Sequence, residues 1–503
     1  MLPPRPSHIV CPMKTSVRWL NRYLTPGDVT PSQAEQILTQ AGFPIETTEA
    51  LISGDTMIDV EITSNRGDCI SHLGLAREIA AATGRTLTYP AIPASVVSGT
   101  DAGAIKATGS KGGIGEFVGL ENRVPDVSKL FTARVIRGVK VGPSPAWLVD
   151  ALAAVGQRSI NNIVDITNFV LFEFGQPTHV FDLKKLRPAP GLTQASVLVR
   201  YANKGEKLTL LDGKTVELRE NELVVADGVE AVSLAGIMGG LGSEVSESTT
   251  DVLLEGATWD PVTIRRAGRR LGLRTDASHR FERTVDPRTI DLAARRAAAL
   301  IVELGGPDAR LIPGVLQAGQ SPKALTSVAV RVSRCREVIG VPVTAAEMIK
   351  AFRGHEIQVA HQHSTSSADL GTLDCVIPAH RPDLDREIDL IEEIARTIGL
   401  DRIPISDKIA VRVAEPQVSE RAARELANVL TGLGFYETVT FSFVSPKHAE
   451  PFLPQGLSLL SLCDERRKAD PTLRPSVIPS LLACRRANQD GNVTAGGGVR
   501  LFE

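Results

Sequence analysis

The stretch EKLTLLDGKTVELRENELVVADGVEAVSLA, residues 206–235, contains two Asp-Gly pairs, and each pair lies between two apolar runs. Asp-Gly between apolar segments is a strong signal for a β-hairpin, because the tight turn needs residues that tolerate a positive φ. Helical patterns surround this stretch. Residues 144–156 carry one apolar face, and an Ala-rich segment that begins at Asp286-Pro287 ends at Gly305-Gly306. Hairpins mixed with helices predict an α+β domain that ends near residue 315.

Mixed α/β units are expected on both sides of this domain. On the N-terminal side, Thr30 caps a helix with Pro31 at its first position, MIDVEIT (57–63) alternates like a strand, and Ser71 caps a helix that ends at Gly84. Between these units, residues 91–115 are rich in Ala, Gly, Ser and Pro, which is typical of a linker.

The C-terminal side repeats the mixed style. SVAVRVS and DCVIPA are expected strands, with one helix and a polar loop (361–373) between them and a helix at 385–398. A helix capped by Ser419 is followed by a strand at TVTFSFV (438–444). The predicted organisation is an extension without order at 1–12, an N-terminal α/β domain at 13–90, a flexible linker at 91–115, a central domain at 116–315, a further mixed domain at 325–406 and a partial unit at 416–503.

Composition limits the classes of protein to consider. The 503 residues suit about three or four domains, and no run approaches the ~18 apolar residues of a membrane span. The N-terminus lacks the apolar core of a secretory signal, and the six cysteines form no CxxC pair, so a reducing cytoplasm is favoured. The net charge of −2 excludes global steering toward nucleic acid. Basic charge is local: the arginines at 265, 266, 269 and 270 suit either a phosphate-binding face or an ordinary exposed helix face.

Several polar residues stand in positions that suit a pocket. RTDASHRFER (274–283) could be a solvated surface or a pocket wall. Glu255 lies inside an apolar strand, where a carboxylate is costly unless paired, so it is either an ion-pair partner or an acceptor for a ligand. GIMGG (236–240) is either a tight turn or a place where backbone approaches a ligand closely. Arg158 and His179 are pocket candidates, although a lone buried histidine is more often a satisfied core residue.

An acidic set lies near residue 390. Asp389, Glu392 and Glu393 stand at i, i+3 and i+4 of a predicted helix, and Asp383 precedes it. Four hard oxygen donors without His or Cys suit Mg²⁺. A solvated face paired with neighbouring arginines is the alternative, and the residues alone favour that alternative.

Long stretches of the chain resemble the beta subunits of bacterial phenylalanine–tRNA ligases. The resemblance covers nearly everything from Met13 to Glu503. The matching text is DVEITSNRGDCISHLGLAREIA (59–80), RSINNIVDITNFVLFEFGQPTHVFD (158–182), LAGIMGG (234–240), VLLEGATWDP (252–261), RTDASHRFERTVDP (274–287), RPDLDREIDLIEEIARTIG (381–399), TLRPSVIPSLL (472–482) and VRLFE (499–503).

The resemblance implies a fold and a division of labour. It implies an α+β multidomain chain with a central α/β editing-type domain, a metal-binding mixed domain after it and an incomplete class II synthetase-like module at the C-terminus. Two alpha and two beta subunits would act on tRNA(Phe) in the cytoplasm, without a membrane. The alpha subunit would use ATP to attach phenylalanine, and the beta subunit would hydrolyse tyrosine wrongly attached to the same tRNA. A hydrophobic site rejects an added hydroxyl poorly, which is why a second site is needed.

The resemblance also assigns residues. Glu255 would accept the tyrosine hydroxyl, and His179 would orient the ester or a water molecule. The remaining editing-pocket positions would be Arg158, Gly239, Thr275 and Ala277. A Mg²⁺ ion shared with the alpha subunit would be held by Asp383, Asp389, Glu392 and Glu393.

Three departures from the family pattern leave other functions open. About a dozen residues join Pro44 to the strand at 57–63, where the family usually inserts an oligonucleotide-binding-like barrel. The sequence ends inside the synthetase-like module, which leads us to expect a truncated chain. Thr284 stands where the family usually has Gly. The alternatives are a non-catalytic assembly or tRNA-binding protein and a free-standing aminoacyl-tRNA deacylase.

Overall fold

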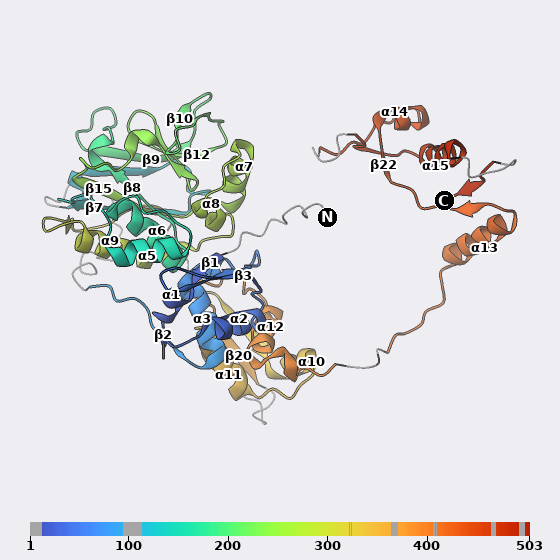
Figure 1. The fold of residues 1–503 in the computed structure, drawn as a ribbon, viewed down its shortest axis with the longest axis horizontal. Coiled ribbons are helices and arrows are strands. Elements are labelled where there is room, and N and C mark those ends of the chain that lie inside the picture. Colours follow the sequence, from blue (N-terminus) through green and yellow to red (C-terminus); the bar gives the residue numbers. More distant parts are fainter. Residues whose placement is uncertain are drawn as a thin grey trace. The chain divides into compact units, whose positions relative to one another are not determined.

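The computed structural model describes residues 13–93, 113–320, 322, 324–363, 371–405, 408, 410–463, 469–491 and 498–503, with only the backbone at 361–363. The predicted extension at 1–12 and most of the predicted linker, 94–112, lie outside these ranges. The chain divides into two units, Met1–Ile405 and Ser406–Glu503. Both mix helices with strands, as Figure 1 shows. Among the described residues, no helix combines the length and the apolar character that crossing a membrane requires.

Two sheets form the centre of the first unit. Both predicted Asp-Gly hairpins are confirmed, one joining β10 to β11 and the other joining β12 to β13. One sheet has the order β14-β13-β12-β9-β6, and the other has the order β16-β7-β15-β8 with β17 also paired to β7. The strands of the first are β6 Val118–Asn122, β9 Ala195–Tyr201, β12 Leu223–Ala226, β13 Ala231–Leu234 and β14 Met238–Gly239. Those of the second are β7 Leu130–Arg137, β8 Thr178–Asp182, β15 Asp251–Ala257, β16 Arg310–Leu311 and β17 Leu316–Gly319. The small hairpin is β10 Lys207–Thr209 and β11 Thr215–Glu217.

Alternate residues of β15 enter two different cores, because successive side chains point to opposite faces of a sheet. Val252 and Leu254 join a core with helices α5 (Ala146–Ala154), α6 (Asn162–Phe174) and α9 (Ile290–Leu304). Figure 1 shows these three helices together beneath this sheet. Leu253, between them, joins the core shared with the other sheet. Glu255 is therefore on the face that looks toward the other sheet.

Two further helices complete this region, α7 (Pro261–Leu271) and α8 (Asp276–Phe281). Asp260 caps α7 with Pro261 at its first position. The helix predicted to begin at Asp286-Pro287 differs slightly: Asp286 caps a single 3-10 turn, Pro287–Thr289, and α9 starts at Ile290. The other 3-10 turns here are η2 Ile114–Glu116, η3 Leu183–Lys185 and η4 Leu241–Ser243.

The N-terminal module packs against the helical face of the central sheet. Its elements are β1 Met13–Ser16, α1 Val17–Asn21, β2 Leu24–Thr25, α2 Pro31–Gln40, β3 Ile45–Ala50, β4 Thr56–Val60, η1 Gly67–Cys69, α3 His72–Thr83 and β5 Thr86–Leu87. The predicted capping box of Thr30 and the helix from Ser71 to Gly84 are confirmed. Trp19 stacks on His72 at 3.9 Å between ring centroids and on Phe169 of α6 at 4.4 Å, so the two modules share one core.

The mixed module after the central sheets has its own core. Its elements are β18 Ser327–Arg331, α10 Val332–Ile339, α11 Ala345–Gly354, β19 Gln358–His363, β20 Thr372–Val376, α12 Glu387–Ile398 and η6 Leu400–Arg402. The sheet order is β18-β20-β19. The sequence predicted β18, β20 and α12, but it predicted one helix where α10 and α11 form. It also missed β19, whose end at 361–363 falls in the predicted polar loop.

The second unit has short strands and exposed helices. It contains α13 Val418–Gly432, β21 Tyr436–Glu437, β22 Phe443–Val444, α14 Pro446–Ala449, η7 Glu450–Phe452, β23 Thr472–Leu473, α15 Ile478–Asp490 and β24 Leu501–Phe502. Two predictions were wrong here. The helix cap is Gln417 rather than Ser419. The strand predicted at 438–444 is formed only at Phe443–Val444, because those are the residues with a partner strand.

Thr284 adopts a backbone conformation that suits glycine. Its φ is +68°, and an L residue in this left-handed region costs roughly 1–2 kcal/mol. Glycine avoids most of that strain, at an entropic cost of roughly 0.5–1 kcal/mol. We therefore expect Thr284→Gly to raise the free energy of unfolding by about 1 kcal/mol, measured by thermal unfolding. Thr284→Ala keeps a Cβ and should gain less, so a Gly variant no more stable than the Ala variant would contradict this account.

Candidate functional site

Glu255 and His179 lie directly opposite each other on neighbouring strands. They are registered partners of the antiparallel pair β15 and β8, so their Cβ atoms are about 4.5–5.5 Å apart on one face of the sheet. Phe181, two residues beyond His179, lies on the same face and meets the imidazole edge to face at 4.5 Å between ring centroids. Phe181 belongs to the core between the two sheets. The pair therefore faces the space between the sheets.

The carboxyl group of Glu255 is buried without a charged neighbour. The residue is 7% exposed, and its Oε2 atom has no hydrogen-bond partner among the described residues. Burial raises the pKa of Glu255 to about 8, so at neutral pH the group is mainly a protonated acid. A buried polar atom without a partner is uncommon and calls for an explanation. The interpretation of Glu255 as an ion-pair partner is not supported. The interpretation that Glu255 accepts a hydrogen bond from a ligand remains.

His179 is a neutral imidazole held against glycine backbone. Burial lowers the pKa of His179 to about 4, so the ring is uncharged at neutral pH and can donate or accept a hydrogen bond. A Cβ added to Gly239 would lie 2.6 Å from Cε1 and 2.9 Å from Nε2 of His179. Any side chain at position 239 would therefore displace the imidazole. The GIMGG segment therefore forms the tight turn between β13 and β14, and its Gly239 backbone packs against His179.

The start of α8 is tied to the same segment. Thr275 caps α8 by accepting a hydrogen bond from the backbone N–H of Ser278, and its hydroxyl donates to the carbonyl of Ile237 at 2.8 Å. Ala277, two residues further, is partly buried against both cores. RTDASHRFER is thus not a wholly solvated surface, because residues 278–281 are buried while Arg274 and Asp276 are exposed. Its first half is the beginning of a helix that lies beside the glycine segment.

Arg158 lies on the loop between α5 and α6 with an exposed side chain. Its neighbour Gln157 donates from Nε2 to Oδ2 of Asp276 at 3.0 Å, which joins this loop to the start of α8. The structure therefore brings Glu255, His179 and Gly239 together directly. Thr275 and Ala277 are linked to them through Ile237, and Arg158 stands on the outer loop.

The four carboxylates predicted to bind Mg²⁺ do not form a common ligand shell. No three of them approach within 4.8 Å through their oxygen atoms. The guanidinium of Arg381 lies between Asp383 and Glu393 and donates to both, at 2.9 Å and 2.7 Å. Asp389 accepts a hydrogen bond from Arg386 at 2.8 Å, and Glu392 is exposed. These residues do not fit a magnesium site, because arginine hydrogen bonds already use the oxygens of three of them.

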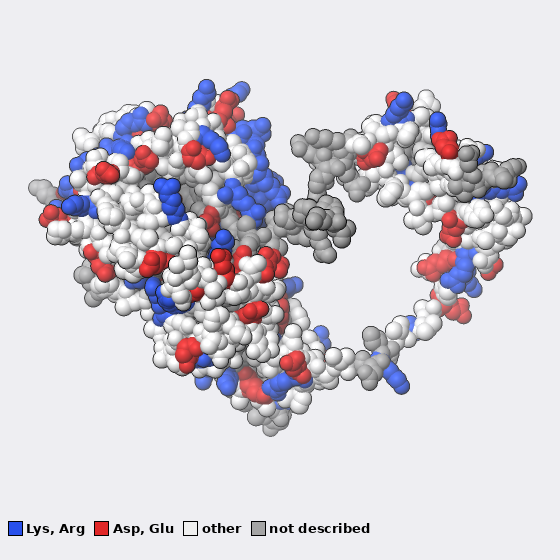
Figure 2. All heavy atoms as spheres, viewed as in Figure 1, with Lys and Arg blue, Asp and Glu red and all other residues white. Residues whose placement is uncertain are grey.

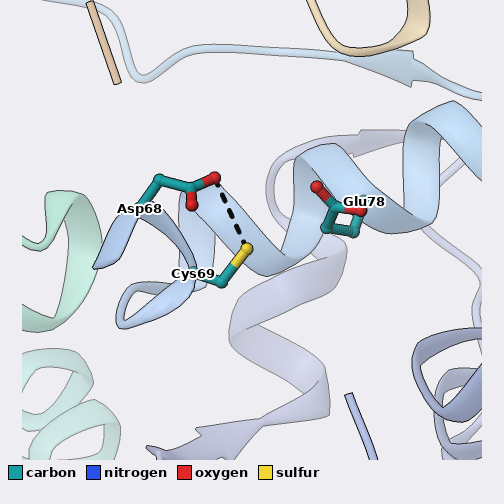
Figure 3. Close-up of side chains that lie close together, drawn as sticks. All are labelled: Asp68, Cys69 and Glu78. Carbon is teal, nitrogen blue, oxygen red and sulfur yellow. Dashed lines mark hydrogen bonds between the residues drawn. The ribbon is translucent and has the colours of Figure 1, made fainter. Parts of the chain in front are cut away.

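A different acidic cluster lies in the N-terminal module. Figure 3 shows Asp68, Cys69 and Glu78 close together, and these are the described residues whose donor atoms come within 4.8 Å of one another. The guanidinium of Arg66 fills the cluster, donating to all three at 2.9, 3.0 and 2.5 Å. Burial raises the pKa of the Cys69 thiol, which disfavours the thiolate that a metal needs. The cluster is a buried ion-pair group and not a metal site.

This group joins the module to the residues around α12. Arg396 of α12 donates to Glu78 and to Glu393, and Arg77 donates to Glu356 at 2.7 Å. The sequence offered pairing of Glu393 with neighbouring arginines as an alternative, but it did not predict the links to the N-terminal module. The available signal was the density of opposite charges in SNRGD and in LAREIA, but Arg77 and Glu78 also pair with Glu356 and Arg396, hundreds of residues away.

A basic face covers part of the central domain. Figure 2 shows Lys and Arg side chains gathered over the region of α7 in Figure 1. Arg266 and Arg269 are exposed there, whereas Arg270 is held by Glu222 at 2.5 Å and 2.6 Å. This helix face offers positive charge for a phosphate backbone.

Three family models match the chain. They are the B3/4 domain at residues 127–306, the tRNA synthetase B5 domain at 328–400 and the phenylalanyl tRNA synthetase beta chain CLM domain at 406–503. Together with the mixed α/β modules, these matches define a multidomain chain of the aminoacyl-tRNA synthetase class.

Named relatives make the assignment specific. The beta subunit of phenylalanine–tRNA ligase from Rhodopirellula baltica is 39% identical over 95% of this chain and 66% of the relative, and that from Geobacter sulfurreducens is 39% identical over 88% and 52%. The chain belongs to the family of phenylalanine–tRNA ligase beta subunits. It spans between about half and two thirds of the length of these curated relatives. A solved N-terminal fragment of the phenylalanyl-tRNA synthetase beta-subunit from Pyrococcus horikoshii is similar at a TM-score of 0.42 and 14% identity, over 77% of this chain and 99% of that one.

Proposed function

We propose that this chain is the editing component of a phenylalanine–tRNA ligase and hydrolyses tyrosine from mischarged tRNA(Phe). The observation that carries the proposal is the buried, unpartnered carboxyl of Glu255 opposite the neutral His179. A hydroxyl on the amino acid would give the Oε2 atom the hydrogen bond that it lacks. Phenylalanine has no such hydroxyl, so the site would prefer the incorrect amino acid.

The chemistry proposed for the site is attack by water. Thr275 already uses its hydroxyl to cap α8 and to bind the Ile237 carbonyl, so it is not free as a nucleophile. The neutral His179 would hold a water molecule or the ester carbonyl in position. Water adds to the carbonyl carbon, the bond to the ribose oxygen breaks, and that oxygen takes up the proton. Backbone at Gly239 can approach the ester because no side chain intervenes.

ATP and Mg²⁺ enter the proposal only through the complete ligase. Attachment of phenylalanine would take place on the alpha subunit, in the cytoplasm. The four carboxylates near α12 do not fit a magnesium site, and no step of the proposed hydrolysis uses a metal ion.

Two surfaces support the proposed partners. The apolar side chains along α13 are exposed, with Leu426, Val429 and Leu433 each about three-fifths accessible, which suits contact with another protein. We propose the alpha subunit as that protein, in an assembly of two alpha and two beta subunits. The exposed arginines of α7 suit the backbone of tRNA(Phe).

The test is deacylation by the full chain, with and without the alpha subunit. Tyr-tRNA(Phe) should be hydrolysed faster than Phe-tRNA(Phe). Activity without the alpha subunit would favour the free-standing deacylase. No hydrolysis in either case, together with stable binding to the alpha subunit, would favour a non-catalytic assembly role and would refute the proposal.

Gly239→Ala gives a sharper test of the site. The new Cβ would collide with the imidazole of His179, which is a side chain that can move, so folding should be retained. We expect a loss of at least about tenfold in kcat, as for a displaced orienting group, measured by single-turnover deacylation. Gly242→Ala is the control, because a Cβ there meets no atom within 4 Å. Equal activity of the two variants would remove His179 and Gly239 from the site.

A further inference from the structure

A cavity of about 310 Å³ lies beside the proposed hydrolytic site. This volume is at the lower end of the range for ligand pockets, roughly 300–1,000 Å³. Three segments that are distant in sequence form its walls: β1 and Ile70 of the N-terminal module, the loop after α5, and the beginning of α8. The lining residues that carry the argument are Lys14, Gly156, Gln157, Arg274, Thr275 and Arg280.

Positive charge dominates the lining. Lys14, Arg274 and Arg280 are basic, Asp276 is the single acid among the lining residues, and burial with nearby arginines lowers the pKa of His279 to about 3, so that ring is neutral. Arg280 is buried and donates to the Ile70 carbonyl at 3.2 Å. Its guanidinium is therefore fixed in the wall.

The positive charges of Lys14 and Arg274 are available to bind a ligand. Both are exposed, and within the described ranges neither takes part in an ion pair. The Lys14 ammonium reaches the loop after α5, because a Cβ on Gly156 would lie 3.3 Å from its Nζ atom. Arg274 directly precedes Thr275. The two cations therefore line the cavity from different segments of the chain.

The cavity and the proposed site share their walls. Thr275 lines the cavity and also binds the Ile237 carbonyl of the glycine segment. Gln157 lines the cavity and hydrogen-bonds Asp276, and the next residue along the chain is Arg158. A ligand held at Glu255 and His179 that extends along the start of α8 would reach Lys14 and Arg274.

We propose that this cavity binds a phosphodiester group of the nucleic acid strand that carries the ester. The inference rests on the proposed function, because it identifies what adjoins the ester. The ammonium of Lys14, the guanidinium of Arg274 and the amide of Gln157 line the same cavity, and together they match the charge and the hydrogen-bond acceptors of a phosphate. The cavity thereby places the terminal nucleotide, and the site beyond Thr275 receives the amino acid.

The experiment compares two esters and two double variants of the full chain. The substrates are Tyr-tRNA(Phe) and the tyrosyl ester of adenosine, which has no phosphate. Lys14→Ala with Arg274→Ala should raise the KM for the tRNA ester at least tenfold and leave kcat nearly unchanged. It should change neither constant for the adenosine ester. Lys204→Ala with Arg219→Ala removes the same charge from exposed positions outside the cavity and should change the KM for the tRNA ester less than twofold.

Salt dependence provides a second readout. Each lost phosphate contact to a single strand lowers the slope of log affinity against log salt by about 0.7, so the cavity variant, which loses one phosphate contact, should lose about 0.7 in slope and the control should not. Equal effects on both esters, or none on either, would overturn the proposal. So would a cavity variant that no longer melts at the temperature of the parent.

A binding measurement separates this proposal from the proposed function. If the parent hydrolyses neither ester, the proposed function fails, and the cavity is then tested by titration with 5′-AMP, adenosine and inorganic phosphate, followed by NMR. A nucleotide phosphate site is supported if the parent binds 5′-AMP more tightly than adenosine and the cavity variant loses this preference. If inorganic phosphate binds as tightly as 5′-AMP, the cavity is a free-phosphate site and the proposal is overturned. The proposal is also overturned if the double substitution leaves the affinity for 5′-AMP unchanged.

Discussion

Arg381→Ala is expected to lower the free energy of unfolding of the first unit by about 3–5 kcal/mol, the usual cost of removing one partner from a buried ion pair. Arg381 is 1% exposed and is hydrogen-bonded to Asp383 and Glu393. Burial alone would raise the pKa of Glu393, but Arg381 and Arg396 hold it well below its usual range. Without Arg381, the Glu393 carboxylate stays buried but loses one of the two positive charges that offset the cost of its burial. Urea unfolding followed by circular dichroism measures the difference.

The sign of the pH dependence follows from the same pKa. Glu393 has a lower pKa in the folded chain than in the unfolded chain, so its contribution is present above about pH 4.5 and is lost as the pH falls further. The difference in free energy of unfolding between the parent and Arg381→Ala should therefore become smaller as the pH falls below about 4.5.

Arg331→Ala is the matched control for this prediction. Arg331 pairs with Glu387 at 2.6 Å, in the same module and with similar geometry, but its side chain is 61% exposed. An exposed pair contributes about 0–1 kcal/mol. If the two variants lose equal free energy of unfolding, the ion pairs of Arg381 with Asp383 and Glu393 are solvated and do not form a buried network. Stabilisation of the parent by added Mg²⁺, reversed by a chelator, would show instead that the carboxylates exchange arginine for a metal ion.

The local structure of this chain was predictable where a short segment decides it. The capping box of Thr30 and the turn at Asp212-Gly213 depend on residues within four positions of one another. Such signals operate before any tertiary contact forms. The strand predicted at 438–444 failed for the opposite reason, since a strand persists only where a partner strand supplies hydrogen bonds.

The candidate site was predictable only in part. A carboxylate in an apolar strand already marked Glu255 as unusual, and the structure confirms its burial. The helical spacing of Asp389, Glu392 and Glu393 was also right. What the spacing could not provide was the partner: Glu393 meets Arg396 on its own helix, but Arg396 also holds Glu78, 318 residues away. The hydrogen bonds from Arg381, Arg386 and Arg396, and not the helix face, decide whether these acids are free to bind a metal.

The free energy of unfolding of the parent should fall as the pH rises from 6.5 to 8, and Glu255→Gln should remove this fall. Burial raises the pKa of Glu255 from 4.5 to about 8, so over this range the folded chain holds a proton that the unfolded chain has released. Stability then falls as the pH rises, by about 1.4 kcal/mol per pH unit, or about 2 kcal/mol in all. His179, with its pKa lowered to about 4, has the opposite effect, but only below pH 6.5. Unfolding by urea at a series of pH values measures the slope.

The same carboxyl should decide the choice of amino acid. Glu255→Ala removes the group proposed to meet the tyrosine hydroxyl, and a hydrogen bond between neutral groups is worth about 0.5–1.5 kcal/mol, or roughly two- to tenfold in selectivity for Tyr-tRNA(Phe) over Phe-tRNA(Phe). Hydrolysis should persist, because this residue recognises the substrate and His179 orients it. Glu247→Gln, at an exposed position, is the control and should keep both the parent slope and the parent selectivity. A Glu255→Gln variant with the parent slope would show that Glu255 does not titrate in this range. A Glu255→Ala variant that loses hydrolysis but keeps its tyrosine preference would assign recognition to another residue.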